Sequence, residues 1–98
     1  MQLKIGQVLT CEAVPKSKLL HSTVRVGTKT LSILSGIAKA YTPEQMIGKK
    51  VVVVTNLPPR EMKGYLSEGM IVCAEDEIGN ISLLSPEKDI IADGSECC

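Results

Sequence analysis

The clearest helix signal in this sequence lies at residues 42–48, and it is too short to build a helical protein. Thr42 fits the N-cap, Pro43 the first helical position and Gln45 the third, so we expect a capping box. Gly48 is a typical residue to follow the last turn. Because the segments on both sides have strand patterns, the chain must place one short helix, expected to run through residues 46–47, inside a β-sheet protein.

Three strand patterns precede this helix. Residues 3–13 alternate with period two, so one face should carry Leu3, Ile5, Leu9, Cys11 and Ala13. Residues 14–18 interrupt the alternation with a proline, which cannot donate to a β-ladder. We expect a second strand over 20–26 and a third over 30–35, joined by a short hairpin connection at 27–29.

The pattern after the helix is also that of strands. Residues 51–55 form a β-branched run suited to a buried strand. We expect residues 56–66, with two prolines, to form a loop long enough to suggest function. The last strands are expected over 69–74 and 78–84, with an acidic turn between them, and residues 85–98 as an irregular tail.

This order of elements predicts an all-β fold. Five strands with one short helix between strands three and four are typical of the OB-fold, a five-stranded Greek-key barrel, here with a C-terminal extension. An SH3-like barrel would lack the capped helix. With 98 residues, we expect a single domain over 1–98. OB-folds bind oligonucleotides on the strand 2–3 face and on the 1–2 and 4–5 loops.

The residues that could support catalysis or metal binding are few. The one histidine, His21, falls in mid-strand, where we expect an exposed or hydrogen-bonded strand residue, and no phosphate-binding loop is present. The four cysteines lack zinc-ligand spacing, and Cys11 and Cys73 lie in apolar runs. We therefore expect no enzyme activity, no metal and no cofactor. Without a signal peptide or an apolar stretch of about 20 residues, a cytoplasmic location and no membrane partner are expected.

Charge and aromatic content bear on a nucleic-acid partner. Residues 1–67 hold ten basic and three acidic residues, a balance of +7, whereas residues 68–98 have a balance of −7. The first part could attract a polyanion, although a chance distribution of solvated charges is the alternative. The only aromatic residues, Tyr41 and Tyr65, are too few for rows of base-stacking platforms. Binding, if it occurs, should depend on charge and small polar groups.

The loops of the predicted barrel supply candidate binding residues. The 1–2 loop has Lys16 and Lys18, the 4–5 loop has Arg60 and Lys63, and the second strand adds Arg25; all could contact phosphates or be solvated. Short polar groups that could bind a base edge or a ribose hydroxyl, or instead satisfy loop backbone, belong to Asn56 and Ser67. A methionine that could lie against a base, or else pack in the core, is Met70.

Several motifs in order resemble the tRNA-binding domain family across nearly the whole chain. These motifs are Gly-Ile-Ala-Lys-Ala-Tyr-Thr-Pro-Glu at 36–44, Gly-Lys-Lys followed by four valines at 48–54, Asn-Leu at 56–57, Gly64, Ser-Glu-Gly-Met at 67–70 and Ala-Glu-Asp at 74–76. The resemblance implies an OB-fold that binds tRNA by shape, commonly as a homodimer, either free-standing or as an accessory part of methionyl-tRNA synthetase. It also implies tRNA contacts at Lys18, Asn56, Ser67 and Met70. From the division of charge, we expect the acidic residues from 68 to 96 to be kept away from the ligand.

The sequence departs from this family at two places. The usual segment before the first strand, which often helps the dimer form, is replaced by Leu-Lys-Ile-Gly at 3–6, and the 1–2 loop lacks the His-Pro-Asn-Ala-Asp form. CsaA-type export chaperones share the fold but depart from Ser-x-Gly-Met, which this chain retains, and that favours tRNA over unfolded polypeptide. Two alternatives stay open: such a chaperone, or a dimerisation module of a synthetase.

Overall fold

The structure is a computed structural model that describes residues 2–98. The elements within those residues are β1 (Leu3–Ala13), β2 (Leu20–Val26), β3 (Lys29–Ser35), α1 (Pro43–Met46), β4 (Lys50–Val54), β5 (Arg60–Met62), β6 (Tyr65–Ser67), β7 (Met70–Ile71), β8 (Cys73–Glu75) and β9 (Ile81–Leu83). The five strands expected for the barrel are β1, β2, β3, β4 and β7.

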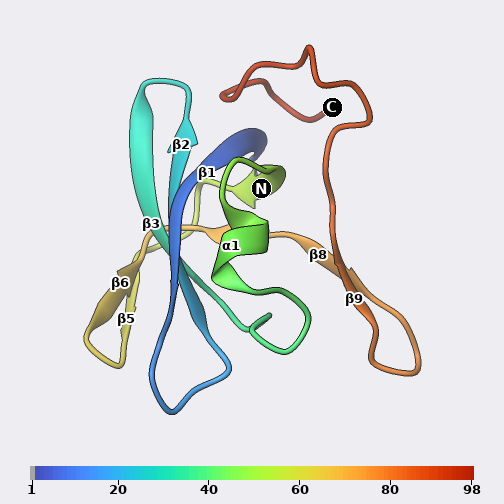
Figure 1. The fold of residues 1–98 in the computed structure, drawn as a ribbon. Coiled ribbons are helices and arrows are strands. Elements are labelled where there is room, and N and C mark those ends of the chain that lie inside the picture. Colours follow the sequence, from blue (N-terminus) through green and yellow to red (C-terminus); the bar gives the residue numbers. More distant parts are fainter. Residues whose placement is uncertain (1) are drawn as a thin grey trace.

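These five strands form one antiparallel sheet in the order β3-β2-β1-β4-β7 that curls on itself (Figure 1). The gap between its two outer strands, β3 and β7, is bridged just before β7, where the Glu68 N–H donates to the Ser32 carbonyl at 2.7 Å. The sheet is a curled half-barrel whose open side is bridged by this hydrogen bond. The predicted OB-like, nearly all-β fold is confirmed. Its interior is aliphatic, with Val8, Val24, Ile33, Val51 and Val53 at most 1% exposed.

The helix forms where its capping signal predicts. The Gln45 N–H donates to the Thr42 hydroxyl and the Thr42 N–H donates to the Gln45 side chain, so both halves of the capping box are present. The helix ends at Met46 rather than at residue 47, because Ile47 is already extended and half exposed. Met46 is fully buried in the core, so this short helix packs a methionine into the barrel.

A β-bulge in β1 contradicts the expected facing of its residues. Val8 lies opposite Val24, but Thr10 lies opposite Thr23, so Leu9 is an extra residue without a partner. The extra residue reverses the alternation. Val8 therefore enters the core ahead of the bulge and Cys11 packs against it afterwards, whereas Leu9 is 37% exposed. The prediction that Leu3, Ile5, Leu9, Cys11 and Ala13 share one face was wrong, because odd-numbered residues before and after the bulge point to opposite faces.

The last part of the chain differs from the two continuous strands expected over 69–74 and 78–84. β7 pairs with β4, whereas β8 pairs with β9 in a separate hairpin that projects from the barrel (Figure 1). Residues 78–80 belong to the turn, because the Asp76 carboxylate accepts the N–H groups of Ile78 and Asn80. This hairpin is attached to the rest by the Leu83 N–H, which donates to the Tyr41 hydroxyl at 2.9 Å.

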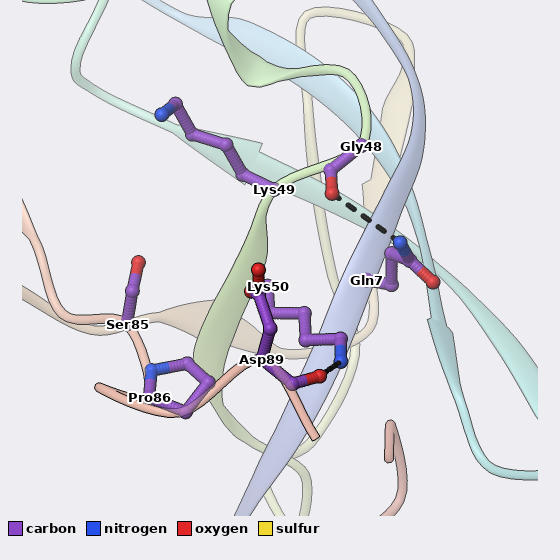
Figure 2. A pocket seen from close by; sticks show the side chains of 7 residues that line it. All are labelled: Gln7, Gly48, Lys49, Lys50, Ser85, Pro86 and Asp89. Carbon is purple, nitrogen blue, oxygen red and sulfur yellow. Dashed lines mark hydrogen bonds between the residues drawn. The ribbon is translucent and has the colours of Figure 1, made fainter. Parts of the chain in front are cut away.

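The tail after residue 84 is largely irregular, as expected, but the barrel holds it at several points. Backbone hydrogen bonds join Ile5 to Gly94 and Ser95, and Leu3 to Cys97. The Lys50 ammonium donates to the backbone carbonyl of Asp89, as Figure 2 shows, and also to that of Ile91. The tail is therefore fastened along β1 and beside the start of β4.

Asp93 makes the most specific of these attachments. Its carboxylate accepts one hydrogen bond from the Arg25 guanidinium at 2.9 Å and another from the Gly27 N–H at 2.8 Å. These hydrogen bonds, that from Arg25 foremost, hold the pKa of the Asp93 carboxyl below its usual range. Asp93 thus joins the acidic end of the chain to a cation of its basic part.

We predict that Gly6→Ala destabilises the barrel. A Cβ at Gly6 would lie 2.6 Å from a methyl carbon of Val24 and 3.0 Å from one of Val53. Overpacking of this kind typically costs about 1–3 kcal/mol, which chemical denaturation would measure. Gly36→Ala is the matched control, because a Cβ there meets nothing within 4 Å. Equal unfolding free energies for the two variants would contradict the packing described here.

We predict that Asp93→Asn releases the tail at neutral pH. Because the folded-state pKa of Asp93 is lowered, its contribution to stability is present above the unfolded-state value and is lost as the pH falls. The wild-type tail should therefore loosen around Asp93 only as the pH falls below the ordinary pKa range of a carboxyl group, whereas the variant tail should be loosened there at every pH. Amide exchange at Gly27 and Gly94 reports this. Asp89→Asn is the control, since Lys50 binds the Asp89 carbonyl rather than its side chain.

Candidate nucleic-acid interface

The segment between β4 and β7 forms a small hairpin instead of the loop expected over 56–66. β5 pairs with β6, so that Arg60 lies opposite Ser67 and Met62 opposite Tyr65. The two turn residues, Lys63 and Gly64, both have positive φ angles, 52° and 82°, as a type I′ turn requires. A two-residue turn that ends in glycine was the available sequence signal, but asparagine or aspartate usually stands first.

This hairpin lies beside β3, and its tip points to the same end of the barrel as the β1–β2 loop (Figure 1). The β2–β3 turn points to the opposite end, on the side of the tail. The expectation that the 1–2 and 4–5 loops flank one region agrees with this arrangement.

A groove of about 330 Å³ opens beside the hairpin. We call it the hairpin groove; it is lined by Leu34, Leu57, Pro58, Arg60, Met62, Ser67, Gly69 and Met70. The lining is mostly apolar, and 48% of Met70 is exposed. Three of the predicted binding residues, Arg60, Ser67 and Met70, therefore meet in one groove, whereas sequence reasoning missed its apolar members Leu34 and Met62.

Ser67 has a structural role at this groove. Its hydroxyl accepts the Leu34 N–H and donates to the Gly69 carbonyl, both at 3.1 Å. Its single proton is therefore committed, although a second lone pair remains for a ligand donor. Gly69 is required beside it, because a Cβ there would lie 2.8 Å from the Val54 carbonyl oxygen.

The acidic segment begins directly beside one of the groove residues. Glu68 directly follows Ser67, and its carboxylate accepts the Ser32 N–H at 2.9 Å. That the acidic residues from 68 onward are kept away from the ligand stays a prediction, and Glu68 does not line the groove. The carboxylate is held toward β3 by this bond and by the Glu68 N–H, which binds the Ser32 carbonyl.

Asn56 lies at the start of the segment that carries the hairpin, and Lys63 lies at the hairpin turn. The Asn56 side-chain oxygen accepts the Gln2 N–H at 2.8 Å, and within residues 2–98 its NH₂ group has no protein acceptor. Lys63 is exposed at the hairpin turn. Both residues can therefore donate to a ligand, Asn56 from beside β4 and Lys63 from the tip of the hairpin.

Lys18 lies in the β1–β2 loop next to a second lysine. The Lys18 carbonyl accepts the Ala38 N–H at 3.2 Å, which fixes the loop against the segment after β3. The Lys18 side chain lies so close to Lys39 that it lowers the pKa of the Lys39 ammonium. No carboxylate in the described part of the chain forms an ion pair with either lysine. This pair, of which sequence reasoning found only Lys18, concentrates uncompensated positive charge.

Arg25 is separated from the other predicted binding residues. It lies near the β2–β3 turn, where it binds Asp93 and donates to the Gln7 side chain at 3.0 Å. Because it is already engaged with a carboxylate, its role in this structure is to fasten the tail. Lys16 lies in the β1–β2 loop, exposed and with a positive φ of 58°.

Other features of the described residues do not suggest chemistry. A larger polar cavity, about 620 Å³, lies between the start of β4 and the tail, where Lys50 is occupied by carbonyl groups (Figure 2). Among residues 2–98, no three His, Cys, Asp or Glu side chains are grouped as a metal site would need. Cys11 and Cys73 are half buried, and burial raises the pKa of each thiol. No helix in the same residues is long and apolar enough to cross a membrane.

Comparisons with known proteins agree with this geometry. The model of the family described as "Putative tRNA binding domain" matches residues 3–94. A methionine–tRNA ligase of Chloroherpeton thalassium is 50% identical over 92 residues, which cover 93% of this chain but 13% of the ligase. The chain thus spans about an eighth of the length of that relative.

Two solved structures resemble the fold over nearly the whole chain. A protein from Pyrococcus horikoshii related to methionyl-tRNA synthetase has a TM-score of 0.92 and 33% identity, covering 99% of this chain and 89% of its own. The chaperone CsaA from Bacillus anthracis has a TM-score of 0.89 and 28% identity, covering 99% and 90%. With a family model that matches almost every residue and a neighbour of the same fold, this chain belongs to the tRNA-binding domain family.

Proposed function

We propose that this chain is a non-catalytic module that binds tRNA by its shape and its sugar–phosphate backbone. The observation that carries the proposal is the gathering, at one end of the barrel, of cations that have no ion-pair partner among residues 2–98. Lys18 lies in the β1–β2 loop next to Lys39 of the segment after β3, and Arg60 and Lys63 lie on the hairpin that points the same way as this loop. Cations placed around a groove bind phosphates and give affinity without base-sequence information.

The hairpin groove supplies the second part of the proposed interface. Met70 and Leu57 offer exposed apolar surface, and Asn56 offers a free NH₂ group. A base or ribose that lies on this surface could accept from Asn56 or donate to Ser67. Arg25 is not part of the proposed interface, because its guanidinium fastens the tail through Asp93.

The proposed partner beyond tRNA is a methionyl-tRNA synthetase. The similarity to about an eighth of a methionine–tRNA ligase supports an accessory role in which the chain adds tRNA affinity and catalysis resides elsewhere. A cytoplasmic location follows from such a partnership.

We predict that Lys18→Ala weakens tRNA binding about three- to tenfold and lowers the dependence of log affinity on log salt by about one unit. One phosphate contact fewer releases one counterion fewer. Electrophoretic-mobility titrations with total tRNA at two salt concentrations would measure both quantities. Lys29→Ala is the matched control, because Lys29 is an exposed lysine near the β2–β3 turn at the opposite end. Equal effects of the two substitutions would exclude the proposed interface.

A chaperone of the CsaA type is the second candidate. The observation in its favour is the exposed apolar lining beside the hairpin, where Leu57, Met62 and Met70 are each more than a third exposed, together with the similarity to CsaA. Salt-sensitive tRNA binding without suppression of a client protein's aggregation would remove this candidate. Suppression of aggregation without tRNA binding would establish it instead.

A homodimer is also proposed, with the C-terminal part as its interface. Ile78 at the tip of the β8–β9 hairpin and Ile90 in the tail are 85% and 84% exposed. Leu84, between them along the chain, is 41% exposed. Apolar side chains that lie together on a surface often mark protein interfaces, and a second copy of this chain is the partner that the family resemblance implies. A module that acts only by dimerisation would use the same surface.

We predict that wild-type protein is a dimer by light scattering and that Ile78→Asp combined with Ile90→Asp yields a monomer. Burying two carboxylates without partners opposes association. Ile47→Asp is the control, because Ile47 is 52% exposed at the end of α1, outside the C-terminal part. A monomeric wild type would exclude both the dimer and the purely dimerising module.

A further inference from the structure

His21 lies at the centre of a hydrogen-bonded chain that the proposed interface does not use. From β2 its Nδ1 lies 3.2 Å from the Glu12 carboxylate on β1. Its Nε2 lies 2.7 Å from the Ser32 hydroxyl on β3, which in turn lies 2.6 Å from the Leu66 carbonyl on β6. This series of hydrogen bonds thus crosses β1, β2 and β3 and ends on the β5–β6 hairpin.

The number of protons in this chain of contacts determines the state of His21. A serine hydroxyl has one proton, and Ser32 must donate it to Leu66, because a carbonyl can only accept. Ser32 can therefore only accept from His21, which requires a proton on Nε2. The Glu12 carboxylate is also an acceptor, so the contact at Nδ1 requires a second proton. All three hydrogen bonds exist together only when His21 is the doubly protonated imidazolium.

The neutral imidazole must lose one of these bonds. With its proton on Nε2, the Nδ1 lone pair faces a carboxylate. With its proton on Nδ1, Ser32 must turn its own proton to His21, and the Leu66 carbonyl loses its donor. Glu12 is exposed, so water replaces part of the lost interaction. The frequency with which the hairpin opens should therefore differ between the two protonation states by several-fold rather than a hundredfold.

Ser32 and Tyr65 transmit this difference to the hairpin. Besides the bond to Leu66, the Ser32 backbone exchanges hydrogen bonds with Glu68. The Tyr65 ring packs on the His21 ring with centroids 4.8 Å apart, and an aromatic face attracts a cation more than a neutral ring. His21 thus makes one direct contact with β6, through the Tyr65 ring, and orients the Ser32 hydroxyl that makes another; both contacts favour its charged form.

The charged and titratable groups around His21 come from each neighbouring element. Glu12 on β1 is in direct contact, Glu68 reaches Ser32 from the segment before β7, and the Tyr65 ring comes from β6. The Cys11 thiol on β1 is occupied by the buried Ser22 hydroxyl at 3.4 Å. Of the two carboxylates, only that of Glu12 contacts the His21 ring; that of Glu68 is bound to the Ser32 N–H.

We propose that His21 is a proton-dependent latch: in its charged form, it fastens the β5–β6 hairpin to β3 and keeps the hairpin groove in shape. As the pH rises, the hairpin should open more often and, resting on the proposed function, the affinity for tRNA should fall. The latch itself does not depend on the identity of the ligand.

Amide hydrogen exchange of the protein alone tests the latch. Between about pH 5.5 and about pH 8, the range in which histidines change charge, hairpin protection corrected for intrinsic rates should fall about fivefold, while β1 and β4 serve as internal reference. In Glu12→Gln the new NH₂ group can donate to a neutral Nδ1, so protection should be high at both values. Ser32→Ala should lower the protection of the hairpin at both pH values. An unchanged wild type, or an equal fall in Glu12→Gln, would overturn the proposal.

Titrations with total tRNA at the same two pH values test the consequence. The wild type should lose about fivefold in affinity and Glu12→Gln should not. An equal loss in Glu12→Gln would assign the effect to the charge of the imidazolium alone and would overturn the latch as its cause. If hairpin protection behaves as expected but no tRNA binds at either pH, the latch stands and the proposed function fails.

Discussion

Backbone hydrogen bonds join β1 to three other segments, and the rest of the barrel takes its position from them. The first half of β1 pairs with β4, the second half pairs with β2, and residues 3–5 also bond to the tail. The bulge at Leu9 lies where the strand passes from one set of partners to the next. By adding one residue, the bulge lets both halves of β1 turn small side chains inward. These side chains fit a core in which the buried residues described by the structure include no aromatic side chain, and the sheet can curl around it.

Closure of the barrel and the proposed interface use the same residues. Ser67 and Glu68 bridge the sheet from β7 to β3, and the same short segment forms one wall of the hairpin groove. The groups that could meet a ligand are therefore held by the backbone of two strands rather than by a mobile loop. A site of this kind is positioned before the ligand arrives, which lowers the entropy lost on binding.

The sequence predicted the parts of the fold that local signals determine. Spacing between near neighbours determines the capping box at Thr42 and the strands over 3–13 and 20–26. It also determines the order of strands and helix along the chain, from which the fold was predicted. The facing of Leu9 could not be predicted, because a bulge depends on the partner strand. The hairpin over 60–67 was missed because its turn begins with lysine. For the candidate site, pairing of Arg25 with Asp93 joins residues 68 apart, and no local pattern encodes such a contact.

The docked tail has a consequence for how this protein behaves in solution. Residues 94–97 occupy the hydrogen-bonding side of β1 that β2 leaves uncovered. A bare strand side is a template for pairing with another molecule, and proteins commonly block it with a short covering segment. Here the strand concerned, β1, is paired on its other side with the four consecutive valines of β4. By covering this side of β1, the tail keeps it from pairing with the strands of other molecules. The pairing of Arg25 with Asp93, which fastens the tail, therefore opposes aggregation.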